Sequence, residues 1–310
     1  MKFLIMGTGG VGGFFGGMLS AAGEDVTFVA RGAHFQAMRD QGLRIRTTSK
    51  EWTVGPEHIK DNPSEAGIAD AILFCVKAYD TESAARLLKP VVGPRTVIVS
   101  LQNGIDNEEI IRNVIRAGIV FGGVAYVSAR ISAPGEITES GGFSRIVFGP
   151  LDDSRPPEAA SLHSAFVNAG IRADLRDDIR AELWRKFVFI CSMGSMTALT
   201  RLSQGEIMAS PETMDLVFSA MQEAAAVGKA AGVSFEPLER EKVLEGLKRF
   251  DPGTRSSLSY DLVNGKPIEI EALNGTVVRL GRELGVPTPI HNTIFASLIP
   301  YHRKTVKGEG

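Results

Sequence analysis

Apolar residues in the first half of the chain alternate between short β-branched runs and stretches with helical spacing. The runs predict strands over residues 2–6, 25–30, 44–47, 71–76, 96–100, 121–129 and 144–148. Between and after them, helical spacing covers residues 10–22, 33–41, 81–88, 107–115 and 154–170. Such alternation predicts an α/β domain with a doubly wound, mostly parallel sheet, which is the Rossmann type. Pro134 and Gly135 are expected to form a turn between two antiparallel strands near the sheet edge.

The second half of the chain shows helical spacing alone. Glycines and prolines separate the predicted helices, which cover residues 178–199, 211–232, 236–249, 257–265, 268–285 and 288–304. A chain of 310 residues is long enough for two cores. We therefore predict two domains, residues 1–174 and an all-helical 175–310, with a cleft between them for a small substrate.

Composition restricts the classes of partner and the compartment. The net charge of −2 gives no sign of a nucleic-acid partner. No apolar run approaches the ~20 residues of a membrane span, and the N-terminal run is too short for a signal peptide. Cys75 and Cys191 lie in apolar runs, and the five histidines lack metal-ligand spacing. We expect a cytoplasmic protein with buried thiols, no metal and no membrane partner.

A glycine-rich turn follows the first predicted strand. Gly7 would allow the tight turn, Gly9 the approach of a pyrophosphate and Gly12 close packing of helix on strand. The N–H groups at the start of the next helix would then face the phosphates. This pattern predicts a dinucleotide site made by Gly7, Thr8, Gly9, Gly10, Val11 and Gly12.

The residue that ends the second predicted strand indicates which dinucleotide binds. Arg31 stands nineteen residues after Gly12, where a carboxylate would accept from a free ribose 2′-hydroxyl. A guanidinium there instead suits a 2′-phosphate. The sequence thus predicts NADP(H), and the alternative is an ordinary solvated arginine in a turn.

Lys186 is the strongest candidate for acid–base chemistry. Leu183, Phe189 and Ile190 lie one helical turn from it, so burial would lower its pKa and suit it to proton donation. The alternative is a surface pair with Glu182, in which the lysine stem packs on apolar neighbours and its ammonium stays in water.

Two further polar groups follow predicted strands. Lys77 comes after the strand at 71–76, and Asn103 follows the strand at 96–100. Ligands bind at these strand ends in such sheets, so Lys77 is expected near a ribose, phosphate or substrate and Asn103 near the nicotinamide or carbonyl. The alternatives are a solvated lysine and a simple Asn103-Gly104 turn.

The last third holds Ser257 and two glutamates, Glu269 and Glu271. Gly265 and Pro267 interrupt any helix between the serine and the glutamates, so periodicity does not bring them together. By pattern alone, Ser257 caps a helix and both glutamates lie in the first turn of the next one.

Together these motifs resemble the ketopantoate reductase (2-dehydropantoate 2-reductase) family over essentially the whole chain. They are, in order, Gly7–Gly12, Arg31-Gly32, Val76–Tyr79, Gln102–Gly104, Trp184–Phe187, Ser256-Ser257 with Asp261, and Glu269–Glu271 before Asn274-Gly275. The resemblance implies a Rossmann domain, a helical domain, NADPH as hydride donor and a 2-keto acid substrate. It also implies Lys186 as general acid, Glu269 beside the substrate hydroxyl and Ser257 on the substrate carboxylate. Asn103 and Lys77 would then be active-site polar groups near the nicotinamide.

One departure from the family pattern concerns the substrate. Family members nearest the enzyme of pantothenate biosynthesis carry asparagines four and eight residues after the catalytic lysine, where this chain has Ile190 and Gly194. We expect NADPH-dependent reduction of a 2-keto acid, with 2-dehydropantoate as the leading substrate. A sibling reductase for a more apolar keto acid and a non-catalytic NADP(H) sensor are the alternatives. A homodimer is left open.

Overall fold

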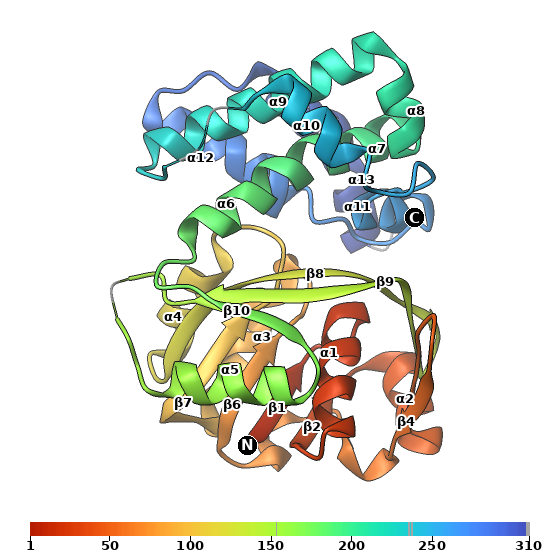
Figure 1. The fold of residues 1–310 in the computed structure, drawn as a ribbon, viewed down its shortest axis with the longest axis vertical. Coiled ribbons are helices and arrows are strands. Elements are labelled where there is room, and N and C mark those ends of the chain that lie inside the picture. The colour runs from red at the N-terminus through yellow and green to blue at the C-terminus, as the bar shows by residue number, and fades with distance from the viewer. Residues whose placement is uncertain (153, 235, 237, 308–310) are drawn as a thin grey trace. The chain divides into compact units, whose positions relative to one another are not determined.

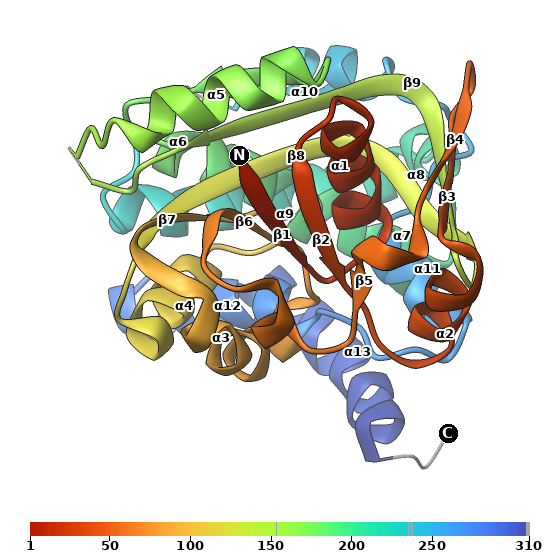
Figure 2. The same ribbon diagram turned by 90° about the horizontal axis from the view of Figure 1, so that it is seen from below.

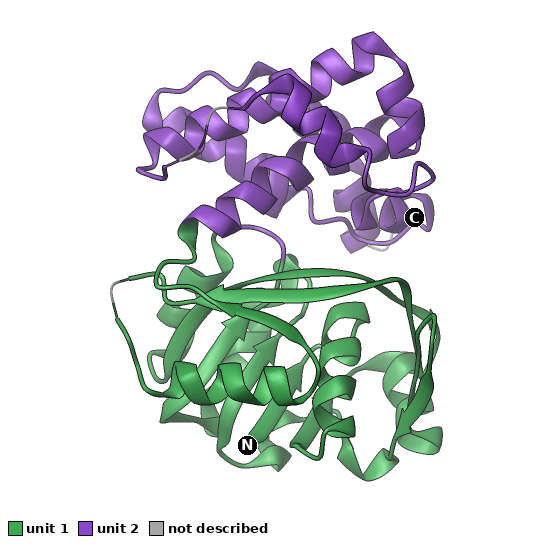
Figure 3. Cartoon of the chain, viewed as in Figure 1, with its two compact units in different colours: residues 1–102, 106–180 green, residues 103–105, 181–310 purple. Residues whose placement is uncertain are grey.

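The computed structural model describes residues 1–152, 154–234, 236 and 238–307. The chain divides into two compact units (Figure 3). Unit 1 consists of Met1–Gln102 and Asp106–Arg180, and unit 2 consists of Asn103–Ile105 and Ala181–Gly310. The chain therefore enters unit 2 briefly after residue 102 and returns to unit 1.

Unit 1 is built on one ten-stranded sheet in the order β4-β3-β9-β8-β7-β6-β1-β2-β5, with β10 paired to β9. Strands β5, β2, β1, β6, β7 and β8 are parallel. The strands are β1 (Lys2–Met6), β2 (Asp25–Val29), β3 (Leu43–Arg46), β4 (Glu51–Val54), β5 (Ile59–Lys60), β6 (Ala69–Phe74), β7 (Val92–Ser100), β8 (Ile119–Ala133), β9 (Glu136–Gly149) and β10 (Arg172–Leu175). The predicted Rossmann-type sheet is confirmed.

Helices cover both faces of this sheet, as Figure 2 shows for α1 and α5 on one side and α3 and α4 on the other. The helices of unit 1 are α1 (Gly10–Ala21), α2 (Gly32–Gln41), α3 (Thr81–Leu88), α4 (Asn107–Ile115) and α5 (Glu158–Asn168). Short 3-10 turns are η1 (Pro56–His58), η2 (Pro63–Ala66), η3 (Ala78–Asp80) and η4 (Lys89–Val91). Along β1, Phe3 and Ile5 join the core under α1 and α5, while Leu4 and Met6 join the core under α3 and α4. Burial on both faces explains why these strands are apolar without alternation.

Strands β8 and β9 form a long antiparallel hairpin closed by the turn at Pro134 and Gly135. The predicted turn near the sheet edge is confirmed, because only β10, or β3 and β4, lie beyond β9. Strand β9 pairs with β8 on one side and with β3 and β10 on the other. Strands β4, β5 and β10 were not predicted, because each has at most four residues and little apolar content.

All regular secondary structure in the described residues of unit 2 is helical (Figure 1). Its helices are α6 (Arg180–Phe189), α7 (Ser195–Thr200), α8 (Gln204–Ala209), α9 (Pro211–Ala230), α10 (Arg240–Leu247), α11 (Ser257–Val263), α12 (Thr276–Leu284) and α13 (Pro289–Lys307). Position 237, inside the helix expected over 236–249, lies outside the described residues. None of the described helices combines the length and the apolar content that a membrane span requires.

Two predicted helices of unit 2 are not regular. The expected helix over 178–199 contains a π turn, η5 (Ile190–Gly194), between α6 and α7. The expected helix over 268–285 begins instead with a second π turn, η6 (Glu271–Gly275), which leads into α12. A π turn inserts one residue into the helical register, and apolar periodicity does not reveal it.

Candidate functional site

The glycine turn has the backbone geometry that a dinucleotide site needs. Gly7 has φ +96°, and a Cβ there would lie 2.8 Å from the nitrogen of Val76. A Cβ at Gly12 would lie 2.3 Å from the carbonyl oxygen of Gly7, so α1 packs directly on the turn. A Cβ at Gly9 would meet no atom within 4 Å, which leaves this side of the backbone open to a phosphate. The residues present therefore fit a bound dinucleotide.

Two other residues of the turn hold it in place. The buried Thr8 donates from its hydroxyl to the carbonyl oxygen of Val29 at 2.9 Å, and its N–H donates to the same oxygen at 3.0 Å. A Cβ at Gly10 would lie 2.1 Å from the carbonyl oxygen of Ala129 on β8. The side chain of Thr8 thus faces β2, and the backbone at Gly10 packs directly against β8.

Arg31 lies at the end of β2, as its sequence position predicts, and is the N-cap residue of α2. Its side chain is 79% exposed and forms an ion pair with Asp80. Asp80 belongs to η3, which starts directly after Lys77, and its N–H donates to the carbonyl oxygen of Lys77 at 2.8 Å. The structure therefore brings the segments that carry Arg31 and Lys77 to the same end of the sheet.

A buried polar cluster supports the strand ends that carry Lys77 and Asn103. The amide nitrogen of Gln102 donates to the carbonyl oxygen of Val76 at 2.9 Å and to the hydroxyl of Thr81 at 2.8 Å. The hydroxyl of Thr81 also donates to Asn107 Oδ1 at 3.0 Å. These bonds fix the residues that precede Lys77 and Asn103, although Asn103 itself belongs to unit 2.

Glu108 lies beside this cluster and is 2% exposed. Burial raises its pKa to about 7, against a weaker opposing effect of hydrogen bonds from its own backbone and from Ser100. Its Oε2 atom has no hydrogen-bond partner among the described residues. A buried carboxyl of this kind is neutral at moderately acid pH.

Lys186 lies on α6 with Leu183 and Phe187 buried beside it. Burial lowers the pKa of Lys186 to about 8, and the negative charge of Glu269 opposes that shift. Glu269, from a distant part of the chain, is 6% exposed. Glu182, the alternative partner, forms an ion pair with Arg185. Unit 2 therefore holds a partly buried ammonium and a buried carboxylate that act on one another.

Ser257, the expected substrate contact and helix cap, is the first residue of α11 and is exposed. The cap is instead Ser256, whose hydroxyl accepts from the N–H of Ser259 at 3.1 Å. The same hydroxyl donates to the carbonyl oxygen of Gly194 at 2.7 Å. The expectation that Ser257 caps the helix is wrong, because Ser256 has the extended backbone of an N-cap.

Ile190 and Gly194 are the first and last residues of η5. Ile190 is partly buried and Gly194 is buried. A Cβ at Gly194 would lie 3.5 Å from Ser256 Cβ and 3.8 Å from Ile190 Cβ. These are ordinary contact distances, so position 194 has room for a small side chain.

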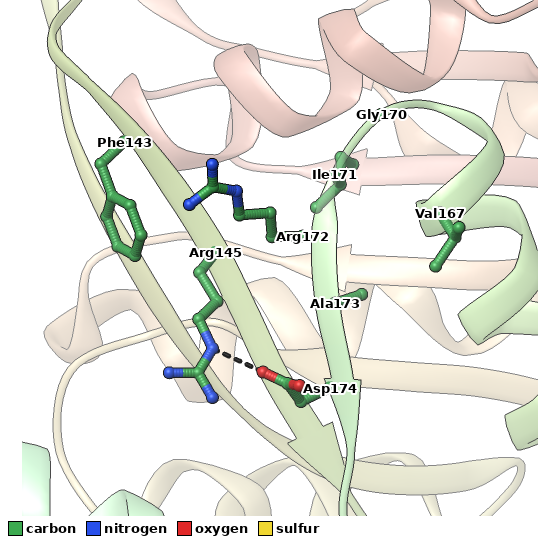
Figure 4. Close-up of a pocket in the computed structure, with 8 residues that line it drawn as sticks. All are labelled: Phe143, Arg145, Val167, Gly170, Ile171, Arg172, Ala173 and Asp174. Atoms are coloured by element: carbon green, nitrogen blue, oxygen red, sulfur yellow. Dashed lines mark hydrogen bonds and ion pairs between the residues drawn. The ribbon is translucent and has the colours of Figure 1, made fainter.

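Several other expectations concern cysteines, metals and pockets. The expectation of buried thiols is confirmed for Cys191, whereas Cys75 is only partly buried, and desolvation raises the pKa of both thiols. No group of metal-ligating side chains occurs in the described part of the chain. A shallow pocket lies along β10 and β9, where Arg145 pairs with Asp174 and Arg172 lies over the ring of Phe143 (Figure 4). It contains none of the predicted site residues.

Sequence reasoning missed a buried polar group centred on Asn274. This side chain is fully buried and bonds to Cys191, Ser195 and His291. The Asn274-Gly275 pair was noted as part of a family motif, which is the one signal that pointed to it. Its partners are distant in sequence, and the histidine lacked any motif.

Comparisons with known proteins cover nearly the whole chain. Residues 3–153 match the family described as "Ketopantoate reductase PanE/ApbA", and residues 178–302 match "Ketopantoate reductase PanE/ApbA C terminal". A 2-dehydropantoate 2-reductase of Mesorhizobium japonicum is 32% identical, over 96% of each chain. One of Archaeoglobus fulgidus is 33% identical, over 94% of each.

The fold comparison agrees with these sequence relatives. The crystal structure of a PanE/ApbA family ketopantoate reductase from Ralstonia eutropha superposes with a TM-score of 0.89 at 33% identity, and covers 99% of this chain and 100% of that one. In the present chain, the glycine turn comes first and the helical unit second, in the order that the motifs predicted. The chain therefore belongs to the ketopantoate reductase family of nicotinamide-dependent oxidoreductases, which reduce 2-keto acids.

Proposed function

We propose that this protein uses NADPH to reduce a 2-keto acid to a 2-hydroxy acid, with 2-dehydropantoate as the leading substrate and Lys186 as the general acid. The observation that carries the proposal is the coupling between Lys186 and Glu269 in a chain that also has a dinucleotide turn. A sensor that only binds NADP(H) would not need a lysine with a lowered pKa beside a buried carboxylate.

The cofactor assignment rests on the turn and on Arg31. The backbone N–H groups at the start of α1 would bind the pyrophosphate next to the open side of Gly9. The exposed guanidinium of Arg31 suits a ribose 2′-phosphate. Bound NADPH supplies the hydride for the keto carbon.

Lys186 would supply the proton. With a pKa of about 8, it is largely protonated at neutral pH yet gives up its proton more readily than an ordinary lysine. Its ammonium would donate to the oxygen on which negative charge develops as hydride arrives. This interaction is stronger in the transition state than with the ground-state carbonyl, so it accelerates the chemical step.

Other residues would hold and orient the substrate. Glu269 would accept from the product hydroxyl and keep Lys186 charged against the cost of its burial. Asn103 and Lys77 would orient the carbonyl and nicotinamide, and the exposed hydroxyl of Ser257 would bind the substrate carboxylate. We propose residues 1–174 as the NADP-binding domain and 175–310 as the domain for substrate binding and dimerisation.

A second candidate function is supported by Ile190 and Gly194. A partly buried aliphatic side chain and a buried glycine have no side-chain group that could hydrogen-bond to a substrate hydroxyl. A buried hydroxyl without a partner costs about 1–3 kcal/mol. A keto acid with a plain alkyl branch would not carry that cost, so a sibling reductase for such an acid is the alternative.

The test is a panel of 2-keto acids assayed by the loss of NADPH absorbance. The panel contains 2-dehydropantoate, its analogue without the hydroxyl and keto acids of increasing branch size. Turnover of at least one member, lowered about 10²–10⁴-fold in Lys186→Ala, supports the proposal. Tight NADPH binding with no turnover across the panel would instead support the sensor.

A further inference from the structure

The two π turns of unit 2 lie next to the two groups that the proposed reaction requires. Turn η5 directly follows α6, the helix of Lys186, and turn η6 begins two residues after Glu269. The turns contact one another. Single π turns inside helices occur frequently at functional sites. The contact between η5 and η6 therefore joins the segment that follows Lys186 to the segment that follows Glu269.

Asn274 of η6 makes this connection. Its side-chain amide nitrogen donates to the carbonyl oxygen of Cys191 in η5 at 3.0 Å. Its side-chain oxygen accepts from the hydroxyl of Ser195, the first residue of α7, at 2.5 Å. Asn274 and Ser195 are both fully buried, so water does not compete for these bonds.

His291 of α13 fixes the orientation of the Asn274 amide. Its Nε2 atom lies 2.9 Å from the carbonyl oxygen of Ala220, which only accepts, so Nε2 carries the proton. Nδ1 must then accept, and the amide nitrogen of Asn274 donates to it at 2.9 Å. Burial lowers the pKa of His291 to about 4, so the ring is neutral at neutral pH. A flipped amide would set its oxygen against the Nδ1 lone pair, and only one orientation satisfies every bond.

The segment of Glu269 is also held on its other side. The N–H of Ile268 donates to Nδ1 of His302 at 3.2 Å. The carbonyl oxygen of Glu269 accepts from the N–H of Leu273 at 3.1 Å. The carboxylate therefore projects from a short segment anchored by His302 before it and by Asn274 after it.

We propose that Asn274 is a positioning residue: its bonds to the Cys191 carbonyl and the Ser195 hydroxyl set where Glu269 stands relative to Lys186. This inference rests on the proposed function in assigning Lys186 and Glu269 to proton transfer. In the proposed role, Asn274 contacts neither the substrate nor the cofactor. Its effect is transmitted through the backbone of η5 and η6.

The physical consequence is a change in the proton affinity of Lys186. Burial disfavours its charged form, and the charge of Glu269 favours that form. The hydrogen bonds from Asn274 to the Cys191 carbonyl and the Ser195 hydroxyl form the link between η6 and η5–α7. When this link is removed, Glu269 is held less closely to Lys186 while Lys186 stays desolvated, so the pKa of Lys186 falls. Other titratable groups on the elements of this link and on the helices bonded to it are Glu182 with its partner Arg185 on α6, Cys191 on η5, Glu271 on η6, Glu223 on α9, and His291 and His302 on α13.

The central variant is Asn274→Ala, compared with Glu269→Gln and with the double variant. We expect Asn274→Ala to lower kcat about 10- to 100-fold, as small misplacements of reacting groups do. In the pH–rate profile, kcat declines above neutral pH. We expect the midpoint of this decline, called the falling limb, to lie at lower pH in Asn274→Ala, as it should in Glu269→Gln. In the double variant, loss of the link should move the limb no further, because no charge remains to be positioned. A limb that stays in place in Asn274→Ala, or moves again in the double variant, would overturn the proposal.

The matched control is Thr213→Val. The Thr213 hydroxyl donates to the carbonyl oxygen of Ile207 at 2.6 Å, elsewhere in unit 2. This control should lose some thermal stability and leave the pH profile unchanged. Where Asn274→Ala does not fold, Ser195→Ala removes only one bond of the link, and its limb should move in the same direction by a smaller amount. An unmoved limb in folded Ser195→Ala counts against the proposal.

A second readout does not depend on turnover. In protein labelled with ¹³C at lysine Cε, the signal of Lys186 is identified by its absence in Lys186→Met, and its titration is followed by NMR. A lower midpoint in Asn274→Ala supports positioning even where no keto acid is reduced. Equal midpoints in the native protein and the variant contradict positioning even where the keto-acid assay succeeds. The proposed reductase function and the positioning role of Asn274 can therefore be contradicted independently.

Discussion

Arg31 and Asp80 form an ion pair between the end of β2 and the 3-10 turn that follows β6. The guanidinium is 79% exposed and the carboxylate 20% exposed, so the pair contributes about 1 kcal/mol or less. A dianionic 2′-phosphate would attract the same guanidinium more strongly than one carboxylate does. Asp80 is therefore expected to compete with NADPH for Arg31 rather than to prevent its binding.

The first prediction concerns cofactor choice. Arg31→Ala should lower kcat/KM for NADPH at least 10-fold and leave kcat/KM for NADH within about 2-fold, since only NADPH carries the 2′-phosphate. Asp80→Asn should lower the KM for NADPH about 2- to 5-fold, because the competing charge is gone. Equal use of both cofactors by the native protein would contradict the role of Arg31.

The second prediction concerns the proton donor. Lys186→Ala should lower kcat about 10²–10⁴-fold with little change in NADPH affinity. Because the protonated amine is the active form and its pKa is about 8, kcat of the native protein should fall as pH rises through that value. Stopped-flow assays at a series of pH values measure the kcat of the variant and the pH dependence of kcat in the native protein. Arg185→Ala, an exposed neighbour on the same helix, is the control and should stay within about 2-fold of the native kcat.

The third prediction separates the two glutamates. Glu269 is buried and its charge acts on Lys186, whereas Glu271 is exposed. Glu269→Gln should lower kcat at least 10-fold and move the falling limb of the pH profile to lower pH, because the charge that favours protonated Lys186 is lost. Glu271→Gln should change neither. A larger loss in Glu271→Gln would mean that the wrong carboxylate has been assigned.

The fourth prediction concerns substrate choice. The native protein should have a lower kcat/KM for 2-dehydropantoate than for its analogue without the hydroxyl, by about 5- to 100-fold, since an unpaired buried hydroxyl costs about 1–3 kcal/mol. Ile190→Asn should narrow that ratio, and Ile190→Val, which stays apolar, should leave it unchanged. Strong preference of the native protein for 2-dehydropantoate would show that other groups bind the hydroxyl.

The fifth prediction concerns stability and Glu108. Its pKa in the folded protein is about 7 against 4.5 for an ordinary glutamate, so the folded state binds more protons between those values. Stability should therefore fall as pH rises from about 4.5 to 7, by roughly 3 kcal/mol at most for this group. Glu108→Gln should flatten that slope in urea unfolding measured at pH 5 and pH 8. An identical slope in the variant would assign the pH dependence to other groups.

The sequence by itself determined the parallel core of unit 1 and the glycine turn, but not the short strands β4, β5 and β10. Residues 2–6 read as a buried strand because Phe3 and Leu4 are both apolar, and the structure buries them on opposite faces of the sheet. The glycine pattern was also recognisable in the sequence. The φ of +96° at Gly7 and the close packing at Gly12 are local backbone constraints that glycine satisfies. Periodicity and glycine placement act over a few residues, which is why sequence reveals them.

Tertiary structure decided the details of unit 2. Whether Ser256 or Ser257 caps α11 depended on backbone conformation, which two adjacent serines do not distinguish in sequence. The coupling of Lys186 with Glu269, and the place of Asn274 between their segments, depend on contacts between residues about eighty positions apart. The π turns that allow these contacts leave the apolar pattern unchanged while they shift the helical register. Local propensity determines the elements, whereas contacts between distant segments bring Glu269 close enough for its charge to act on Lys186.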